Sequence, residues 1–339
     1  MKKNFSAGKD DNNRRLDRVL RKMFPQAGLS QIFHLIRKGS IRINNKKVRP
    51  DTRICEGDEI NVQGLPSPAL DRKKTKPKHK DNFSEFSRLR KMIIFENEHL
   101  LALNKPGGLL THGAGSLDEL VRDYWSLNSS PSLSFRPGPA HRLDRNTSGL
   151  ILYSLSLSGA RNLSLFFRQG AIDKYYLALL DGELNKEESW IDRIERNSKD
   201  KRSFASSSGK PAATVVRPLL KRKGKTLALC AIATGRTHQI RAQGMLHGHP
   251  LSGDIKYQGS NILGGYLLHS ICLHLKRDKA GMFFPPLWAP LPVKARRLLT
   301  SLFSTPPVME ALKSIHEELL PKKGDYAITF KISRVQRKK

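Results

Sequence analysis

The sequence contains little cysteine and no long apolar stretch. Its 339 residues include three cysteines, Cys55, Cys230 and Cys272, and no two of them are spaced as a CxxC pair. This argues against a disulfide framework and fits a reducing compartment, so we expect a cytoplasmic protein. No segment is apolar for long enough to span a bilayer, and the N-terminus lacks the apolar run of a signal peptide. We therefore expect no membrane partner.

Acidic residues are also scarce. The chain carries 61 Lys and Arg against 30 Asp and Glu, which gives a formal net charge of +31. Such an excess opposes compaction through self-repulsion, and a polyanionic partner is the natural explanation. Hydrophobic residues make up 38% of the chain, enough for a packed core, so a disordered polycation is excluded. We expect a folded protein that binds nucleic acid, with a merely solvated basic surface as the alternative.

The N-terminal part predicts a tail followed by a small α/β domain. Residues 1–13 are polar, and we expect them to be disordered. Helical apolar spacing begins at Leu16, and a second helix is expected to stop at Gly39. Short alternating strands follow, with a hairpin turn at Asn44. Residues 14–64 are therefore expected to form a compact unit of two helices and a small sheet.

Several short strings lie in this unit: RLD at residues 15–17, IRKG at 36–39, IN at 43–44 and GD at 57–58. In this order they resemble the RNA-binding domain first described in small-subunit ribosomal protein four. The resemblance implies that the helices and the adjoining loop present basic side chains to RNA phosphates. The candidate contacts are Arg15, Arg18, Arg37, Lys38, Arg42, Lys46 and Lys47. For each of them, an ordinary solvated cation is the alternative.

The remaining chain divides into three parts. Residues 65–90 hold prolines and a basic run, which predicts a linker. Residues 91–303 contain many short apolar runs and few helices, which predicts an α+β domain on a mainly antiparallel mixed sheet with flanking helices. Residues 304–339 form a C-terminal extension whose role the sequence leaves open. The expected strands include residues 150–153, 175–180, 214–219, 226–233 and 266–275, and the expected helices include 157–168, 237–247 and 309–320.

The most informative string is HRLDRNTSG at residues 141–149, followed by an apolar strand. It places Asp144 between Arg142 and Arg145, and neighbouring positive charge favours the ionised carboxylate. Taken alone, the string has an ordinary interpretation: Asp144 caps a loop and joins a surface ion pair.

Further strings accompany it in order: NKPGGL at residues 104–109, KYYLA at 174–178, GKPA at 209–212, GRTHQIR at 235–241, GHP at 248–250, GD at 253–254 and LLH at 267–269. Together they resemble the pseudouridine synthase family that includes the bacterial ribosomal enzymes RluA, RluC and RluD. The resemblance covers roughly residues 92–292. It implies an RNA-modifying isomerase that breaks the N1–C1′ bond of uridine and joins C5 to C1′. No metal and no organic cofactor is expected.

The resemblance also assigns roles to single residues. Asp144 is expected to be the catalytic carboxylate, either attacking C1′ or assisting a glycal route, and Arg241 its cationic partner. Tyr176 is expected to stack on the target base and to take part in proton transfer at C5. Arg142 is expected to enter the RNA and support base flipping. The substrate pocket is expected to be lined by Ile240 and Leu268.

Large-subunit (23S) ribosomal RNA is the expected substrate, because the separate N-terminal domain resembles RluC and RluD; transfer RNA is the alternative. We expect a monomer. A non-catalytic RNA-binding factor would explain the charge, but not the joint presence of Asp144, Tyr176 and Arg241. Gln243 stands where His is usual in the family, and it leaves the geometry beside Arg241 open.

Overall fold

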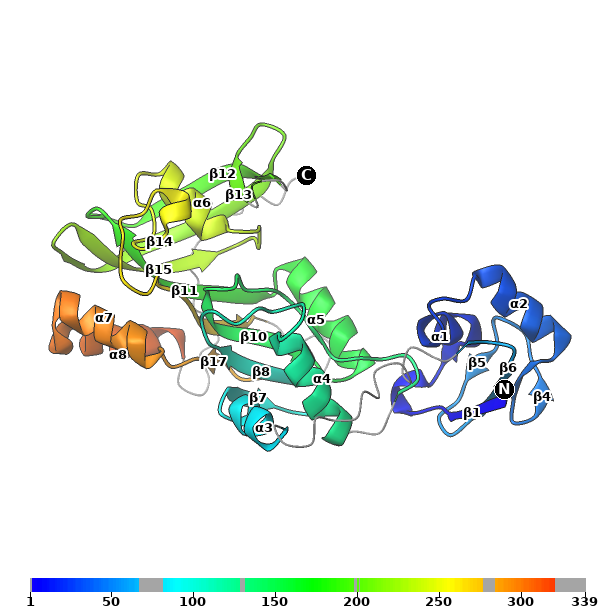
Figure 1. Ribbon diagram of the computed structural model, residues 1–339. Coiled ribbons are helices and arrows are strands. Elements are labelled where there is room, and N and C mark those ends of the chain that lie inside the picture. The colour runs from blue at the N-terminus through cyan, green and yellow to red at the C-terminus, as the bar shows by residue number, and fades with distance from the viewer. Residues whose placement is uncertain are drawn as a thin grey trace.

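The computed structural model describes residues 2–66, 82–128, 132–197, 200, 202–276 and 284–320. It shows two folded units, a small N-terminal unit and a larger unit built on one extended sheet (Figure 1). No helix in these ranges is long and apolar enough to cross a membrane.

The small unit joins a four-stranded sheet to two helices. Its strands lie in the order β1-β6-β3-β4, and a separate pair, β2 and β5, braces the start of the first helix. The second helix ends at Gly39, whose φ of 77° is the left-handed conformation that glycine adopts readily. The elements are β1 (Lys2–Ser6), β2 (Arg14–Arg15), α1 (Leu16–Met23), α2 (Leu29–Lys38), β3 (Ile41–Ile43), β4 (Lys46–Lys47), β5 (Arg53–Ile54) and β6 (Glu59–Gln63).

The expectation of a disordered tail over residues 1–13 is wrong. Strand β1 pairs antiparallel with β6, with Lys2 opposite Gln63, and a short 3-10 helix, η1 (Lys9–Asp11), follows. Phe5 packs edge-on against Phe24 at 6.1 Å between ring centroids. The sequence pattern did not predict this strand, because an edge strand with one exposed face needs few apolar residues.

The expected linker also differs from the structure at its end. Helix α3 (Asn82–Arg90) replaces the last part of it, and Leu89 is buried in the core of the large unit. The basic run at residues 72–80 lies outside the described residues.

The large unit is built on a sheet with the order β13-β12-β14-β15-β11-β16-β10-β8-β7, and β9 and β17 add to β10 and β16. Among the described strands, β10 and β16 pair in parallel and the other pairs are antiparallel. The strands are β7 (Ile93–Glu96), β8 (Leu100–Lys105), β9 (Gly138–Pro139), β10 (Ser148–Ser154), β11 (Ile172–Asp181), β12 (Glu188–Asn197), β13 (Arg202–Ala205), β14 (Lys210–Arg222), β15 (Lys225–Ile232), β16 (Leu268–Leu275) and β17 (Leu287–Trp288). This confirms the predicted α+β class.

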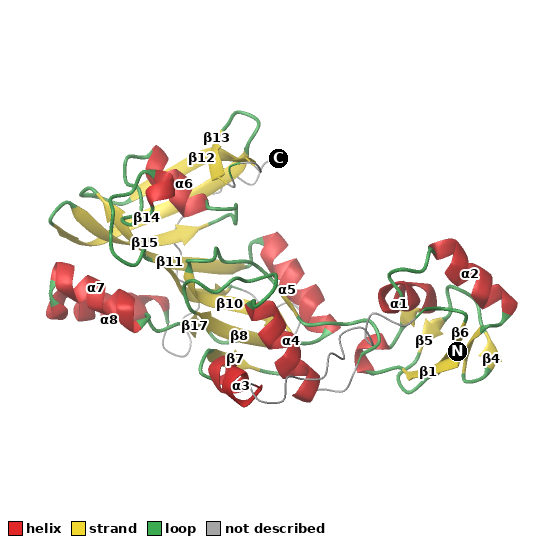
Figure 2. Cartoon of the chain, viewed as in Figure 1, coloured by secondary structure: helices red, strands yellow, loops and turns green. Residues whose placement is uncertain are grey.

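Helices cover the sheet at its sides (Figure 2). They are α4 (Leu117–Asn128), α5 (Leu157–Gln169), α6 (Gln239–Leu246), α7 (Val293–Phe303) and α8 (Thr305–Leu319), with the 3-10 helix η3 (Ile255–Tyr257). Helix α8 lies in the expected C-terminal extension, and its Ile315 and Leu319 are buried in one core with Leu177 and Leu229 of the sheet. The extension therefore contributes to the core of the large unit as far as Leu319; residues 321–339 lie outside the described part.

Candidate active site

The loop that carries Asp144 is held between strands β9 and β10. The Thr147 N–H donates to the Asp144 carbonyl at 3.1 Å and closes the turn. Two residues later comes Gly149, the second residue of β10, whose φ is +105°. A Cβ atom at this position would collide with the backbone of Ser270 on β16. Only glycine permits this parallel pairing, so the glycine that ends the string has a steric cause.

The loop that follows β8 supports the Asp144 loop through hydrogen bonds. The buried Lys105 ammonium donates to the backbone carbonyls of Pro106, Leu109 and Arg145, at 3.1, 2.9 and 3.0 Å. Thr111 adds a hydrogen bond from its hydroxyl to the Leu143 carbonyl. Burial lowers the pKa of Lys105 to about 8, while the nearby Asp144 carboxylate acts in the opposite direction. Lys105 of the NKPGGL string therefore holds the Asp144 loop in place through its hydrogen bond to the Arg145 carbonyl.

Asp144 ends a chain of charges that reaches into the protein. Its Oδ2 accepts from Nη1 of Arg241 at 3.1 Å, and Nε2 of His238 lies 3.6 Å from the same oxygen. Arg241 is 7% exposed and donates through Nε and Nη2 to both oxygens of Asp254, at 2.6 and 2.9 Å. Burial is the largest single influence and lowers the pKa of Arg241, but the bonds to Asp254 together with the electrostatic effects of Tyr266, Asp254 and Asp144 raise the pKa above its ordinary value. The cation beside Asp144 is thus permanent.

Two tyrosine rings fix the guanidinium of Arg241. Its Cζ lies 4.8 Å from the ring centroid of Tyr257 and 4.7 Å from that of Tyr266. Tyr257 also binds Nδ1 of His238 through its hydroxyl, at 2.8 Å. These contacts restrict Arg241 to one orientation, the one that points Nη1 at Asp144.

Tyr176 lies on β11, next to a register shift in the pairing of β11 with β16. Such bulges re-aim side chains and are common beside active sites. Its side chain joins one hydrophobic cluster with Leu143, Ile240 and Leu268. Burial raises the pKa of Tyr176 to about 12, and the Asp144 carboxylate adds to the rise. The phenol is therefore protonated at neutral pH.

The structure brings together Asp144 and Arg241 as expected, and it places Ile240 and Leu268 in the apolar cluster with Tyr176. Arg142 is exposed on the Asp144 loop. Sequence reasoning did not select five supporting residues, namely Lys105, His238, Asp254, Tyr257 and Tyr266. Lys105, His238 and Asp254 occur in the family-like strings, and a search for charged residues in every such string would have found Lys105 and Asp254.

Gln243 does not face Arg241. It is fully buried, accepts from the Thr214 hydroxyl at 2.6 Å, and donates to the Trp190 carbonyl and the Asp192 carboxylate at 2.9 and 2.7 Å. The glutamine thus ties α6 to β12 and β14. Cys230 and Cys272 are buried.

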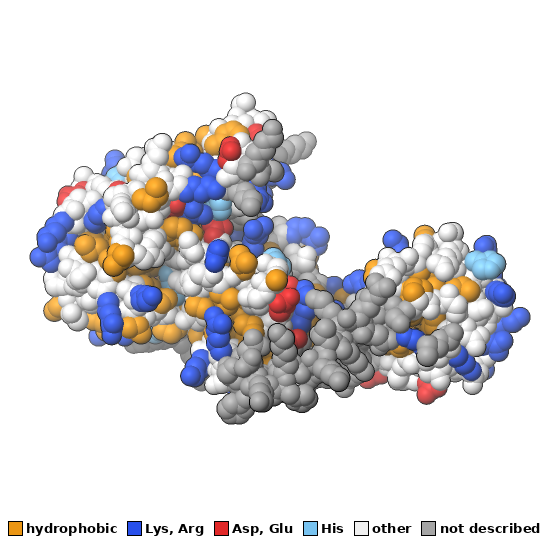
Figure 3. Space-filling view, viewed as in Figure 1, with side chains coloured by type: hydrophobic (Ala, Val, Ile, Leu, Met, Phe, Trp, Pro, Cys, Tyr) orange, Lys and Arg blue, Asp and Glu red, His pale blue; other side chains and the backbone are white. Residues whose placement is uncertain are grey.

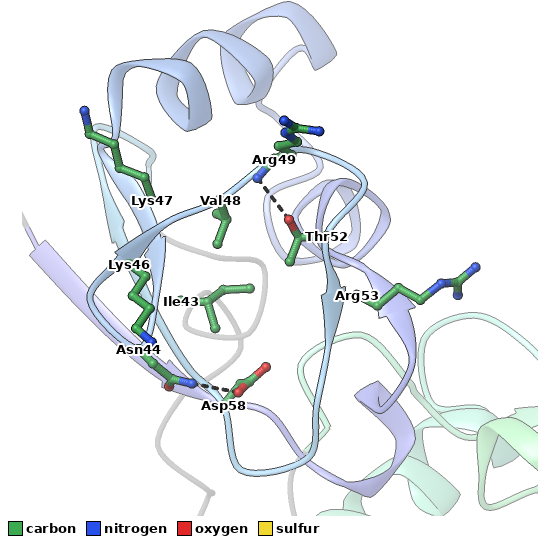
Figure 4. Close-up of a pocket in the computed structure, with 9 residues that line it drawn as sticks. All are labelled: Ile43, Asn44, Lys46, Lys47, Val48, Arg49, Thr52, Arg53 and Asp58. Carbon is green, nitrogen blue, oxygen red and sulfur yellow. Dashed lines mark hydrogen bonds between the residues drawn. The ribbon is translucent and has the colours of Figure 1, made fainter.

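The basic residues of the small unit are mostly exposed (Figure 3). Arg15 forms a two-point ion pair with Asp17, and Arg42 donates to the carbonyls of Gly39 and Asn45. An open hollow of about 560 Å³ lies beside the β3–β4 hairpin, with Ile43 and Val48 among its lining (Figure 4). The cations around this hollow are Lys46, Lys47, Arg49 and Arg53. Arg49 and Arg53 are additions to the set chosen from the sequence.

Within the described residues, no group of three or more His, Cys, Asp or Glu side chains is placed to hold a metal ion.

Comparison with known proteins supports this description of both units. Residues 99–244 match the family described as RNA pseudouridylate synthase, and residues 14–60 match the S4 domain. The chain is 31% identical over 254 residues to ribosomal large subunit pseudouridine synthase C of Vibrio vulnificus, covering 73% of this chain and 78% of that protein. It is 30% identical over 253 residues to the enzyme of the same name from Escherichia coli K12, covering 73% and 77%.

Solved structures show the same fold at lower identity. Human RNA pseudouridylate synthase domain containing 4 superposes with a TM-score of 0.55 at 19% identity, covering 65% of this chain and 96% of that one. Human RNA pseudouridylate synthase domain containing 1 gives 0.52 at 22% identity, covering 68% and 96%. The chain belongs to the RNA pseudouridylate synthase family and is an RNA pseudouridine synthase with an N-terminal S4 domain.

Proposed function

We propose that this protein isomerises specific uridines of large-subunit (23S) ribosomal RNA to pseudouridine, with Asp144 as the nucleophile. The pairing of Asp144 with the buried Arg241 carries the proposal, because it places a cation against a carboxylate where water is partly excluded. The relatives named above act, by their names, on the large ribosomal subunit. Transfer RNA is the alternative substrate.

In this reaction an oxygen of Asp144 attacks C1′, and the N1–C1′ bond breaks with its electron pair on uracil. The contacts from Arg241 and His238 both fall on Oδ2, so Oδ1 is the oxygen that we expect to face the ribose. After the base turns, C5 bonds to C1′ and releases the carboxylate, while C5 loses a proton and N1 gains one. A glycal route assisted by Asp144 is the alternative.

The neighbouring residues hold the nucleotide. Tyr176 offers its ring to the uracil, and its protonated phenol is a hydrogen-bond donor rather than a resting base. Ile240 and Leu268 extend the apolar wall on which the base lies. Arg142, exposed on the same loop as Asp144, is placed to fill the gap that a flipped uridine leaves in the RNA.

We assign RNA binding to the S4 domain, residues 14–64, and catalysis to the large unit that follows the segment at residues 65–90. We also propose that the protein acts as a monomer, and we place that action in the cytoplasm. The candidate phosphate contacts remain the half-buried Arg15 of β2 and the exposed cations Arg18, Arg37, Lys38, Arg42, Lys46 and Lys47.

The test is a map of pseudouridines in 23S ribosomal RNA and transfer RNA from a strain that lacks the protein, by carbodiimide modification and reverse transcription. We expect specific 23S positions to lose the modification, to regain it with the wild-type protein, and not to regain it with Asp144→Asn. Loss confined to transfer RNA would overturn the proposed substrate. Restoration by Asp144→Asn would remove Asp144 from its role and favour an RNA-binding factor without catalysis.

A further inference from the structure

The carboxylate of Asp11 lies buried between the S4 domain and the catalytic unit. Its oxygens accept from the Ser132 hydroxyl at 3.0 Å, the Leu133 N–H at 2.7 Å and the Ser134 hydroxyl at 2.6 Å. A fourth bond comes from the N–H of Gly8 within the S4 unit, at 3.1 Å. Asp11 has no exposed surface. The donors come from both units, so the Asp11 carboxylate joins the S4 domain to the catalytic unit. A buried carboxylate is costly unless it is hydrogen-bonded, so the loss of a donor would destabilise this joint.

Two further contacts belong to the same joint. Asp10 accepts through Oδ1 from the N–H of Leu157, in the first turn of α5, at 2.7 Å. The side chain of Leu133 is 7% exposed and packs in the hydrophobic core of the S4 domain, although it belongs to the catalytic unit. Arg14 donates to the Ser134 hydroxyl. The joint thus combines charged, polar and apolar contacts.

The segment that receives Asp11 leads directly to the active site. After Ser134 the chain forms β9, which pairs with β10, and then continues into the loop of Arg142 and Asp144. Arg136 stiffens the segment by donating to the carbonyls of Ser132 and Phe135, at 3.0 and 2.6 Å. The segment that binds Asp11 and fixes the position of the S4 domain therefore continues directly into the catalytic loop.

Units joined by a small polar interface normally move relative to one another. Here a buried carboxylate, a second carboxylate at a helix start and an inserted leucine oppose such motion. We propose that Asp10 and Asp11 latch the S4 domain in one position, so that RNA held on its basic surface presents a uridine at a set distance from Asp144. Asp11 is then a positioning residue that determines which uridine is modified. This inference rests on the proposed function for its RNA, but the latch itself does not.

The latch can be measured without RNA, by fluorescence energy transfer between the two units. Cys55 is the exposed cysteine of the S4 domain, while Cys230 and Cys272 are buried. A second label enters through Ser164→Cys, at an exposed position of α5. We expect one narrow distance distribution in the otherwise wild-type protein and a broad or shifted one in Asp11→Ala.

Two more variants make this test decisive. Leu133→Ala loosens the joint from the catalytic side, and it should broaden the distribution even if Asp11→Ala misfolds. Lys9→Ala is the matched control, because Lys9 pairs with Glu98 at the same junction but both side chains are largely exposed, at 78% and 65%. Narrow distributions in both Asp11→Ala and Leu133→Ala would overturn the latch.

The consequence for site choice is measured with the purified proteins on 23S ribosomal RNA. In Asp11→Ala and Leu133→Ala, the single-turnover rate at wild-type positions should fall by about tenfold or more, because the first variant loses hydrogen bonds to a charged group and the second loses buried apolar packing. Additional uridines should gain modification, whereas a variant that was merely less stable would modify the same positions at a lower yield. Unchanged positions in loosened variants would overturn the role in site choice. Inactivity of the wild-type protein on this RNA would instead count against the proposed function.

Discussion

At the scale of single residues, the central feature is an arginine between two carboxylates. Arg241 gives two donors to Asp254 and one to Asp144, so the inner carboxylate fixes the cation and the outer one is left free to react. Bidentate pairing of this kind adds geometric precision to the charge.

The role of Asp254 is testable because it does not touch the reacting atoms. We expect Asp254→Asn to lower kcat by about 10- to 100-fold, from the loss of charge-assisted bonds, with little change in KM for RNA. Single-turnover and steady-state kinetics would separate the two. Glu310→Gln on α8, at an exposed position, removes the same charge and should leave both constants unchanged. An unaltered kcat in Asp254→Asn would show that Arg241 does not depend on it.

The sequence predicted Asp144, Tyr176 and Arg241 because these residues lie in long family-like strings. It did not predict the partners Asp254 and Tyr266 as site residues, since their contacts with Arg241 exist only after η3 and β16 are placed beside α6. Tyr266 lies outside the family-like strings, so no local pattern in the sequence marks it, whereas the GD string contains Asp254 without showing that it pairs with Arg241.

At the scale of elements, α6 is attached to the sheet through Gln243. Replacing this buried residue by alanine removes bonds to Thr214, Asp192 and the Trp190 carbonyl. We expect Gln243→Ala to lower the free energy of unfolding by about 1–3 kcal/mol. Urea denaturation followed by circular dichroism measures this change.

The control for Gln243→Ala is Gln169→Ala, at an exposed position on α5. It should be neutral within about 0.5 kcal/mol. Equal stability of the two variants would mean that the network around Gln243 contributes nothing to the attachment of α6. A loss of activity without a loss of stability would place Gln243 in the catalytic machinery instead.

The accuracy of the predicted elements follows how strongly each one is buried. The strand expected at residues 150–153 is β10, buried along its whole length, and the helix expected at 157–168 is α5, which ends one residue later. Strand β12 was missed, because charged residues interrupt its apolar positions and only Trp190 and Ile194 are buried. Edge strands such as β1 were missed for the same reason, because burial on one face only leaves a weak alternation of apolar and polar residues.

At the scale of the whole molecule, the excess of positive charge lies partly on the S4 domain, remote in the chain from Asp144. We expect the triple variant Lys46→Gln, Lys47→Gln and Arg49→Gln to weaken RNA binding and to reduce the slope of log K against log salt. The slope should fall by about 0.7–0.9 for each RNA phosphate that the variant no longer neutralises. The rate on saturating RNA should change little.

The matched control removes three exposed cations from α7, through Lys294→Gln, Arg296→Gln and Arg297→Gln. Both variants change the net charge equally, so a general field effect would lower their salt slopes equally. Only specific binding of RNA at the β3–β4 hairpin gives the larger effect in the S4 variant.

The most direct test of the account is the release of tritium from RNA that carries uridine labelled at C5, because C5 loses its hydrogen only when it bonds to C1′. With purified protein, excess EDTA and no added cofactor, the wild type should release tritium in proportion to the pseudouridine formed. Asp144→Asn should bind the same RNA within a few-fold and release less than about a hundredth as much per unit time, as expected when the nucleophile is removed. Release by Asp144→Asn at a rate near that of the wild type, or a wild-type reaction that stops when metal is removed, would contradict the account.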